Sequence, residues 1–196
     1  PIYDGDNPTA HLKGGMLSDT CYLYAHNKNL LAKLDGVVFD YEPQDGRSAT
    51  TTKNFLTRLV GTTRNAGKSP VLWTNRLTAP GAPKNGIDKS NAPALMNIFD
   101  LLPILIDETI PAANVKAEIR AQQLFYAPTA AERKKIYILT GIGKMNGNQL
   151  RATRAQALEQ AYIGVAVWNN YADFSSCAAK GYRQVNCLVY GLDCGF

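Results

Sequence analysis

Residues 34–42 read LDGVVFDYE, an apolar run that ends in two carboxylates one residue apart, Asp40 and Glu42. Alternate residues of a β-strand point to opposite faces, so these two acids share a face. The opposite face carries three large side chains: Val37, Phe39 and Tyr41. At the end of a buried strand, desolvation and like-charge repulsion raise the pKa of at least one member of such a pair. The pair therefore suits a general acid beside an ionised carboxylate, and a solvated or salt-bridged pair is the alternative.

Five strand-like apolar runs alternate with segments of helical spacing along the chain. The strand-like runs are 36–42, 69–75, 100–107, 134–141 and 162–170. The helical segments are 20–34, 51–65, 93–98, 112–124 and 147–160. Repeated alternation of helix and strand predicts an α/β fold with a parallel sheet covered by helices. Because the strands are almost continuously apolar, both of their faces are expected to be buried, as in a (β/α)8 barrel or a doubly wound sheet.

Polar and aromatic side chains follow several of these runs where each strand is expected to end. They are Asp40 and Glu42, Trp73 and Asn75, Asp107, and Trp168 with Asn169 and Tyr171. Both kinds of parallel sheet bind ligands at the carboxyl ends of their strands. An aromatic plane beside amide groups suits a sugar ring, although core packing is the alternative for each Trp. No GxGxxG or GxxxxGK[ST] motif occurs, which argues against a nucleotide or phosphate binder.

Composition sets broad limits on the molecule. The 196 residues are 45% hydrophobic, which predicts a single domain over residues 1–196. Although the net charge is +5, the basic residues are scattered, so we expect no nucleic-acid partner. No run approaches the roughly 20 apolar residues of a membrane span, so we expect no membrane association. His11 and His26 lack metal-ligand spacing, and we expect no metal and no cofactor.

Four cysteines are present, three of them in the last twenty residues: Cys21, Cys177, Cys187 and Cys194. An even count without a CxxC motif favours one or two disulfides over a metal site, with three possible pairings. Four buried free thiols are the alternative. Disulfides persist in oxidising compartments, so we expect a secreted or extracytoplasmic protein.

The opening stretch resembles the fourth-strand signature DGxDxDxE of glycoside hydrolase family 18, which includes chitinases and endo-β-N-acetylglucosaminidases. The matching residues are Asp35, Gly36, Asp40 and Glu42, whereas Val38 replaces the middle aspartate. Residues 164–174, GVAVWNNYADF, resemble the last barrel strand of the family. Residues 102–108, LPILIDE, stand where its sixth strand lies; Asp107 matches and Ile106 replaces a tyrosine. The resemblance covers roughly residues 35–174.

The resemblance implies a (β/α)8 TIM-barrel-like fold and substrate-assisted, retaining hydrolysis of β-linked N-acetylglucosamine glycans such as chitin. Glu42 would be the acid and base, Asp40 would hold the acetamido group of the sugar, and Trp168 would stack beneath the ring. The expected substrate-binding residues are Asp35, Tyr41, Trp73, Asn75, Asp107, Trp168, Asn169 and Tyr171. Losing polar groups at Val38 and Ile106 supports the alternative, a weakly active or inactive carbohydrate-binding, inhibitor or storage protein.

Only strands four to eight of such a barrel are recognisable here, because residues 1–34 are too few for three βα units. We therefore expect an incomplete barrel in this chain. A missing N-terminal segment or a second chain would complete it, and a reduced barrel is the alternative.

Overall fold

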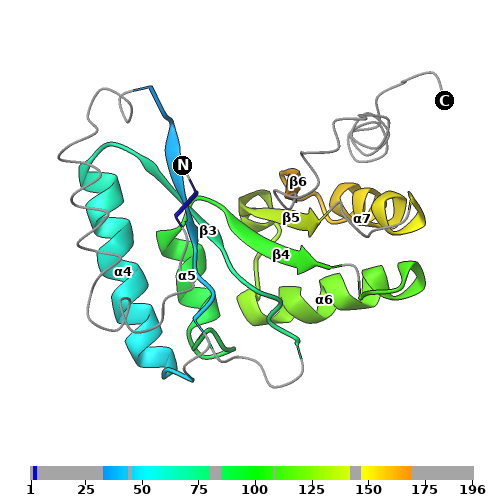
Figure 1. Ribbon diagram of the computed structural model, residues 1–196, viewed down its shortest axis with the longest axis horizontal. Helices are drawn as coiled ribbons and strands as arrows, with labels where there is room; N and C mark the ends of the chain where they lie inside the picture. The colour runs from blue at the N-terminus through cyan, green and yellow to red at the C-terminus, as the bar shows by residue number, and fades with distance from the viewer. Residues whose placement is uncertain are drawn as a thin grey trace, which may run out of the picture. The chain divides into compact units, whose positions relative to one another are not determined.

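The computed structural model describes residues 2–3, 33–43, 46–79, 85–107, 109–141 and 147–168 (Figure 1). The strands in these residues are β1 (Ile2–Tyr3), β2 (Gly36–Asp40), β3 (Ser69–Trp73), β4 (Leu102–Ile106), β5 (Ile136–Gly141) and β6 (Gly164–Trp168). The α-helices are α4 (Ala49–Asn65), α5 (Ala92–Ile98), α6 (Val115–Tyr126) and α7 (Gly147–Glu159). Two short 3-10 helices are η1 (Ala112–Asn114) and η2 (Glu132–Lys135). Strands and helices alternate in order, as the sequence predicts.

The chain divides into two compact units, Pro1–Leu102 with Phe125–Ala127, and Pro103–Leu124 with Pro128–Phe196. The first unit holds a parallel sheet in the order β1-β2-β3. Strands β2 and β3 pair one to one from Gly36 with Ser69 to Asp40 with Trp73. A Cβ atom on Gly36 would lie 2.5 Å from the Ser69 carbonyl oxygen, so this close pairing requires glycine.

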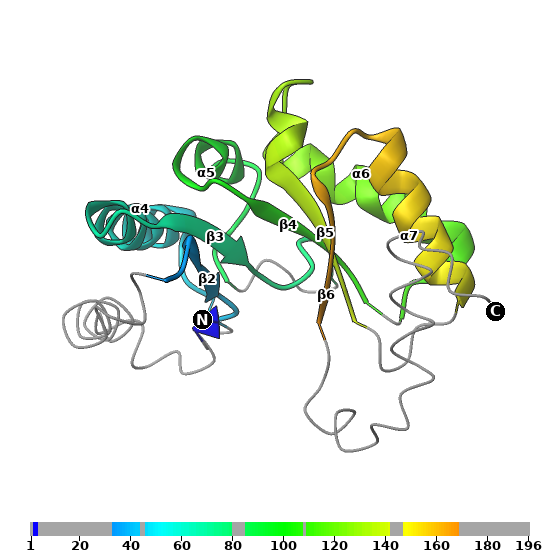
Figure 2. The ribbon, with the colours of Figure 1, turned by 90° about the horizontal axis from the view of Figure 1, so that it is seen from above.

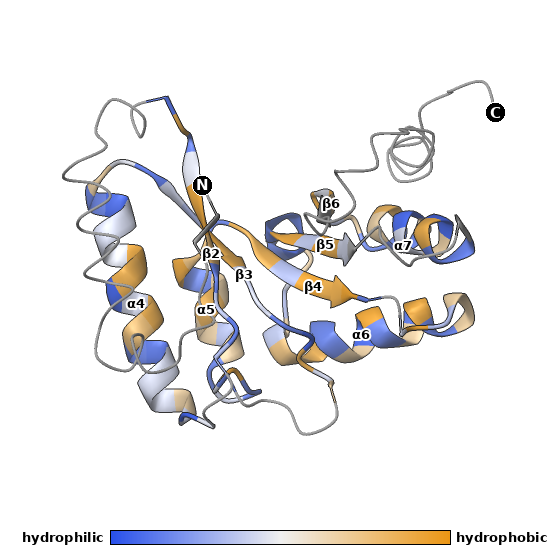
Figure 3. Cartoon of the chain, in the orientation of Figure 1, coloured by the Kyte–Doolittle hydropathy of each residue, from blue (hydrophilic) through white to orange (hydrophobic). Residues whose placement is uncertain are grey.

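Helix α4 packs against the first sheet at β3, and α5 lies beside α4 (Figure 2). The ring of Tyr41 stacks on that of Phe55, with 5.8 Å between centroids. The fully or nearly fully buried core of this face is Val37, Phe39, Tyr41, Leu56, Leu59, Val60 and Leu72. Hydrophobic and hydrophilic bands alternate along α4 accordingly (Figure 3). Packing of this apolar stripe, rather than helix propensity alone, stabilises a helix of this length.

Both ends of α4 are fixed by local sequence. The Ser48 hydroxyl accepts a hydrogen bond from the Thr51 amide at 3.1 Å, which satisfies one of the free N–H groups of the first turn. At the other end Gly67, with φ of +70°, donates to the Arg64 carbonyl at 2.8 Å. Lys68 then donates to the Thr63 carbonyl, so the chain turns directly into β3.

The second unit holds the sheet β4-β5-β6, in which β5 and β6 are parallel and in register from Tyr137 with Gly164 to Gly141 with Trp168. The Gln122 side chain of α6 bonds both backbone groups of Leu105, donating to its carbonyl at 2.7 Å and accepting from its amide at 3.2 Å. The Gln122 amide thus satisfies the backbone N–H and C=O of Leu105, as the backbone of a neighbouring strand would.

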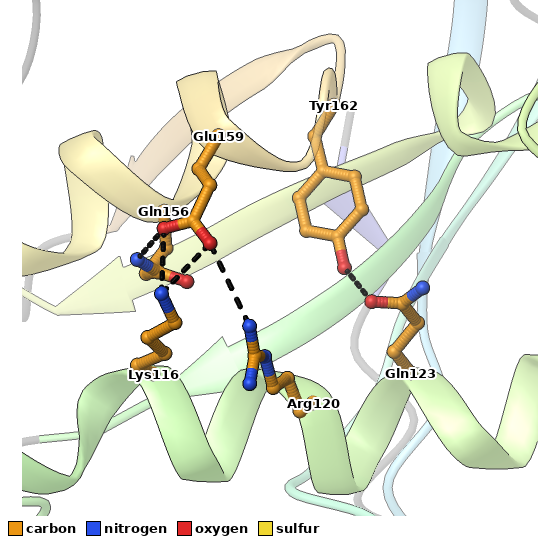
Figure 4. Close-up of polar contacts among 6 residues, drawn as sticks. All are labelled: Lys116, Arg120, Gln123, Gln156, Glu159 and Tyr162. Atoms are coloured by element: carbon orange, nitrogen blue, oxygen red, sulfur yellow. Dashed lines mark hydrogen bonds and ion pairs between the residues drawn. The ribbon is translucent and has the colours of Figure 1, made fainter.

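Helices α6 and α7 are joined by polar contacts on their facing surfaces (Figure 4). Glu159 accepts from Lys116 at 2.8 and 3.0 Å and lies 3.6 Å from Arg120. The Tyr162 hydroxyl, just after α7, donates to Gln123 Oε1 at 2.7 Å. The ion pairs are exposed, and such pairs contribute little to stability.

Five predicted strands and four predicted helices are confirmed, each within a few residues of its expected ends. Of the predicted helix over residues 20–34, only residues 33 and 34 are described, and these two are not helical. All four cysteines and both histidines lie outside the described residues. An α/β fold with parallel sheets is confirmed, whereas a complete barrel, the single domain over 1–196 and the disulfides stay predictions. Among the described residues, no helix is long and apolar enough to cross a membrane.

Candidate active site

The two predicted catalytic acids lie at the carboxyl end of β2. Asp40 is the last residue of the strand, Glu42 follows two residues later, and both are half-buried. Burial alternates along β2, with Val37 and Phe39 buried and Val38 and Asp40 half-buried. This alternation agrees with the prediction that Asp40 lies on the face away from the α4 core.

Trp73 lies beside this pair on the neighbouring strand. It is the register partner of Asp40, and register partners in a sheet point to the same face. The Tyr41 amide donates to the Trp73 carbonyl at 2.8 Å, which continues the pairing of the two chains past the end of β2. Trp73 is half-buried. The first unit therefore brings an acid, an aromatic plane and a second acid to one edge of its sheet.

Tyr41, which the sequence interpretation placed among substrate-binding residues, is completely buried. Its hydroxyl accepts from Arg47 Nη1 at 3.0 Å and lies 3.1 Å from Thr52 Oγ1 of α4. The Arg47 guanidinium also lies over the ring, 5.5 Å from its centroid. Tyr41 belongs to the core beneath α4, because it follows Asp40 by one residue and so points to the opposite face.

Asp35 also occupies a different place from the one expected. It is exposed and precedes β2, so it lies at the amino end of the strand whose carboxyl end carries Asp40. Five residues of strand separate the two Cα atoms by about 16 Å. Asp35 therefore does not join the acids at the carboxyl edge, and its backbone carbonyl instead accepts from the Ser69 amide at 3.0 Å.

Asn75 is held at the end of β3 by buried neighbours. Its Oδ1 accepts from Asn85 Nδ2 at 2.8 Å. The same Asn85 nitrogen donates to Thr74 Oγ1 at 2.8 Å, and the Thr74 hydroxyl donates to the Tyr41 carbonyl at 2.8 Å. Asn85 is 3% exposed and Thr74 is 1% exposed, so both bonds of Thr74 are buried, whereas the bond to Asn75 is partly buried. They tie the ends of β2 and β3 to the loop that follows residue 84.

The loop from Asn85 to Asn91 is itself tied to the start of α4. Thr52 Oγ1 donates to the Asn85 carbonyl at 2.9 Å, and Asn91 Nδ2 donates to the Ala49 and Gly86 carbonyls. Within the loop, the hydroxyl and amide of Ser90 hold the pKa of Asp88 below its ordinary value. Helix, loop and strand ends thus form one hydrogen-bonded assembly.

Asp107 follows β4 in the second unit. Its Oδ1 accepts from the Thr109 amide at 2.9 Å and from the Thr109 hydroxyl. This Asx turn also joins the Ile110 amide to the Asp107 carbonyl at 3.2 Å. The carboxylate shapes the connection to η1, and Ile106 before it is completely buried.

The remaining predicted residues concern the end of β6. Trp168 is the last residue of that strand and the register partner of Gly141. Its side chain, and both Asn169 and Tyr171, lie outside what the structure describes. In the described part of the chain no group of three or more His, Cys, Asp or Glu side chains could hold a metal ion.

Sequence reasoning missed the buried polar residues around the ends of β2 and β3 and in the following loop: Arg47, Thr52, Thr74, Asn85 and Asn91. Their residue types are common in exposed loops, so composition gave no reason to expect burial. The Asn85-Gly86 dipeptide is a turn signal, and it was the one visible sign of a tightly folded loop.

Comparison with known proteins gives a structural relative. No protein-family model matches the chain, and no curated protein matches its sequence. The fold is similar to the catalytic domain of a family GH18 chitinase from a fern, Peteris ryukyuensis, with a TM-score of 0.56 and 16% sequence identity. The match covers 95% of this chain and 66% of the fern domain, so the chain spans about two thirds of that domain's length. At this identity the likeness is one of fold, an α/β architecture similar to that of a family 18 barrel.

Proposed function

We propose that this chain is part of a glycoside hydrolase that cleaves β-linked N-acetylglucosamine glycans, chitin or a related polymer, with retention of configuration. The observation that carries the proposal is the pair Asp40 and Glu42, which ends β2 beside the register partner Trp73. The fold likeness to a family GH18 chitinase domain supports the same reaction class.

In this mechanism Glu42 protonates the glycosidic oxygen as the bond to the anomeric carbon breaks. The acetamido carbonyl oxygen of the substrate attacks that carbon and forms an oxazolinium ion, so the protein needs no carboxylate nucleophile. Asp40 stabilises the positive charge that develops on the acetamido nitrogen. Glu42 then removes a proton from a water molecule whose oxygen attacks the anomeric carbon. The bond from that carbon to the acetamido oxygen breaks, which restores the N-acetyl group.

Aromatic and amide side chains supply substrate binding in this proposal. Trp73 offers an apolar plane to a sugar ring and Asn75 an amide at the same edge of the sheet. In the second unit, Asp107, Trp168, Asn169 and Tyr171 stay proposed glycan-binding residues. The proposal includes a secreted or extracytoplasmic location, where chitin-like polymers occur.

The test is the variant Glu42→Gln, assayed for reducing sugar released from a GlcNAc tetramer. Loss of the general acid is expected to lower kcat by about 10²- to 10⁴-fold while binding stays within a few-fold. Glu132→Gln is the matched control. Its exposed carboxylate, in the segment before β5, accepts hydrogen bonds from the amide and hydroxyl of Thr129. Equal turnover by Glu42→Gln and the unsubstituted chain contradicts the role of Glu42. Binding of the tetramer without turnover in the unsubstituted chain identifies a carbohydrate-binding protein instead.

A further inference from the structure

We infer that Asn85 is a positioning residue, which fixes the Asn75 side chain so that its amide N–H groups, and not its oxygen, face the substrate. This inference rests on the proposed function for its ligand, and it names the chemistry recognised at this point: an oxygen acceptor of the glycan. It is derived from the donors and acceptors around Asn85.

The orientation of Asn85 is set by a backbone donor. Its Oδ1 accepts from the Ile87 amide at 3.0 Å, and a backbone N–H can only donate. The Asn85 oxygen therefore faces Ile87, and its NH₂ group points the other way. Both N–H bonds are then used, one toward Thr74 Oγ1 and one toward Asn75 Oδ1, each at 2.8 Å.

The Thr74 hydroxyl is fixed in the same way from the other side. It donates to the Tyr41 carbonyl at 2.8 Å, and a carbonyl can only accept. The Thr74 oxygen therefore offers only lone pairs to Asn85, so Asn85 must donate an N–H to it. The Ile87 amide can only donate and the Tyr41 carbonyl can only accept. Together they determine which group donates and which accepts in each hydrogen bond between them.

Asn75 stands at the end of this chain of bonds. Because Asn85 presents N–H, Asn75 must offer its oxygen inward, and its Nδ2 is directed away from the buried network. Among the described residues Nδ2 of Asn75 makes no hydrogen bond, and the side chain is half-buried. Asn75 lies two residues after Trp73, the register partner of Asp40, so its donor pair stands just past the end of β3 at which the proposed acids lie.

A turned Asn75 amide would present an oxygen at the same place and repel the acceptor oxygens of a sugar. Substituting Asn85 by Asp removes the donor toward Asn75 while keeping the acceptor for Ile87. The Asn75 amide is then expected to rotate and donate inward to the new carboxylate. The glycan loses one hydrogen bond and meets a lone pair instead.

The decisive measurement is a double-mutant cycle on the affinity for a GlcNAc tetramer, made in a Glu42→Gln background so that no turnover occurs. Asn85→Asp is expected to raise Kd about five- to tenfold, as the loss of one hydrogen bond does. In the presence of Asn75→Ala, adding Asn85→Asp should change Kd less than about twofold, because Asn85 acts through Asn75. An equal effect of Asn85→Asp in both backgrounds, or no effect in either, overturns the inference.

Asn91→Asp is the matched control for damage to the loop. Asn91 is equally buried, at 3% exposure, and its amide bonds only Ala49, Gly86 and Asp88. Its substitution should lower the Tm as Asn85→Asp does and leave the Kd for the tetramer unchanged. A rise in Kd as large as that of Asn85→Asp shows a general loop effect and overturns the inference.

A ligand-free measurement separates this inference from the proposed function. In NMR spectra of the unsubstituted chain, both Asn85 side-chain N–H protons should exchange slowly with solvent and both Asn75 N–H protons quickly. The reverse order overturns the inference whatever the ligand is. If the tetramer fails to bind while the exchange order holds, the proposed function is wrong and the orientation of Asn75 stands.

Discussion

The two three-stranded sheets hold the segments at their carboxyl ends by different means. In the first unit, buried side chains of α4 and of the Asn85–Asn91 loop bond to the ends of β2 and β3. In the second, the described end of β4 is an Asx turn between Asp107 and Thr109, and an exposed ion pair joins α6 to α7. Buried polar side chains occur in both units, and those of the second include Gln122, Thr140, Gln149, Thr153, Gln156 and Gln160. The contrast is therefore confined to the ends of β2, β3 and β4.

The difference between buried and exposed hydrogen bonds indicates which side chains are held in one position. A hydrogen bond shielded from water is electrostatically stronger, and it is costly to leave half-made, so a buried network holds one geometry. Exposed ion pairs readily exchange their partners for water, so they do little to fix the position of the side chains. The strand ends next to the proposed acids are therefore held by buried hydrogen bonds, whereas α6 and α7 are joined by exposed ones. Four predictions test this contrast.

The largest effect is expected from Gly86→Ala. Gly86 has φ of +72°, and a Cβ there would lie 2.3 Å from Thr52 Oγ1 and 2.7 Å from the Arg47 carbonyl oxygen. Both backbone strain and overpacking oppose the change, so the free energy of unfolding should fall by about 2–4 kcal/mol in urea titrations.

Gly67→Ala is the control for that substitution. Gly67 has nearly the same φ, +70°, but nothing lies within 4 Å of a Cβ built on it. Its replacement should cost only the conformational part, about 1 kcal/mol. Equal losses for the two variants contradict the close packing of the loop against α4.

Tyr41→Phe and Tyr162→Phe compare one hydroxyl from each unit. The Tyr41 hydroxyl accepts from the buried Arg47, so its removal takes one hydrogen bond from a charged donor and should cost about 1–3 kcal/mol. The Tyr162 hydroxyl donates to the half-buried Gln123, which water can reach, and about 0.5–1.5 kcal/mol is expected. Urea unfolding of both variants decides the order, and a larger loss for Tyr162→Phe contradicts the contrast between the units.

Burial raises the pKa of Tyr162 to about 12. The folded state then keeps a proton that the unfolded state releases above pH 10, so its contribution is present below pH 10 and is lost as pH rises through 12. The free energy of unfolding should decline less steeply over pH 10–12 for Tyr162→Phe than for the unsubstituted chain. Parallel declines in the two proteins show that Tyr162 titrates normally.

The smallest effect is expected from Glu159→Gln. The Lys116 ammonium holds the pKa of the Glu159 carboxyl below its ordinary value, with help from Gln156 and Arg120. This stabilisation is present above the unfolded-state pKa and is lost as pH falls through the folded one. At neutral pH the variant should lower the Tm slightly, and 1 M salt should remove the difference. A loss that persists in high salt means that Glu159 acts through more than exposed charge.

Periodicity was sufficient to predict the regular elements. Apolar runs marked the five strands β2 to β6, since a strand buried on both faces must be apolar throughout. The side-chain period of two also placed Asp40 opposite Tyr41, and the structure confirms this alternation. Strand β1 was not predicted, because two residues, Ile2 and Tyr3, carry no period.

Tyr41 and Asp35 were expected to contact the substrate, but the structure places both of them away from the two acids. Tyr41 was predicted to bind substrate because it stands between the two acids in the motif. Its side chain points to the opposite face of the strand, into the core. Asp35 was taken from the same motif, although the length of β2 separates it from Asp40. A motif groups residues by sequence distance, whereas contact depends on strand direction and pleat.

The sequence by itself determined the strands, the helices and the common face of Asp40 and Glu42, because these follow from local repeats along one segment. Only the tertiary structure decided that Trp73 lies beside Asp40 and that Asn85 meets Thr74 and Asn75. These contacts join segments that are ten to thirty-three residues apart, and their donors and acceptors are matched only when the chain has folded around them.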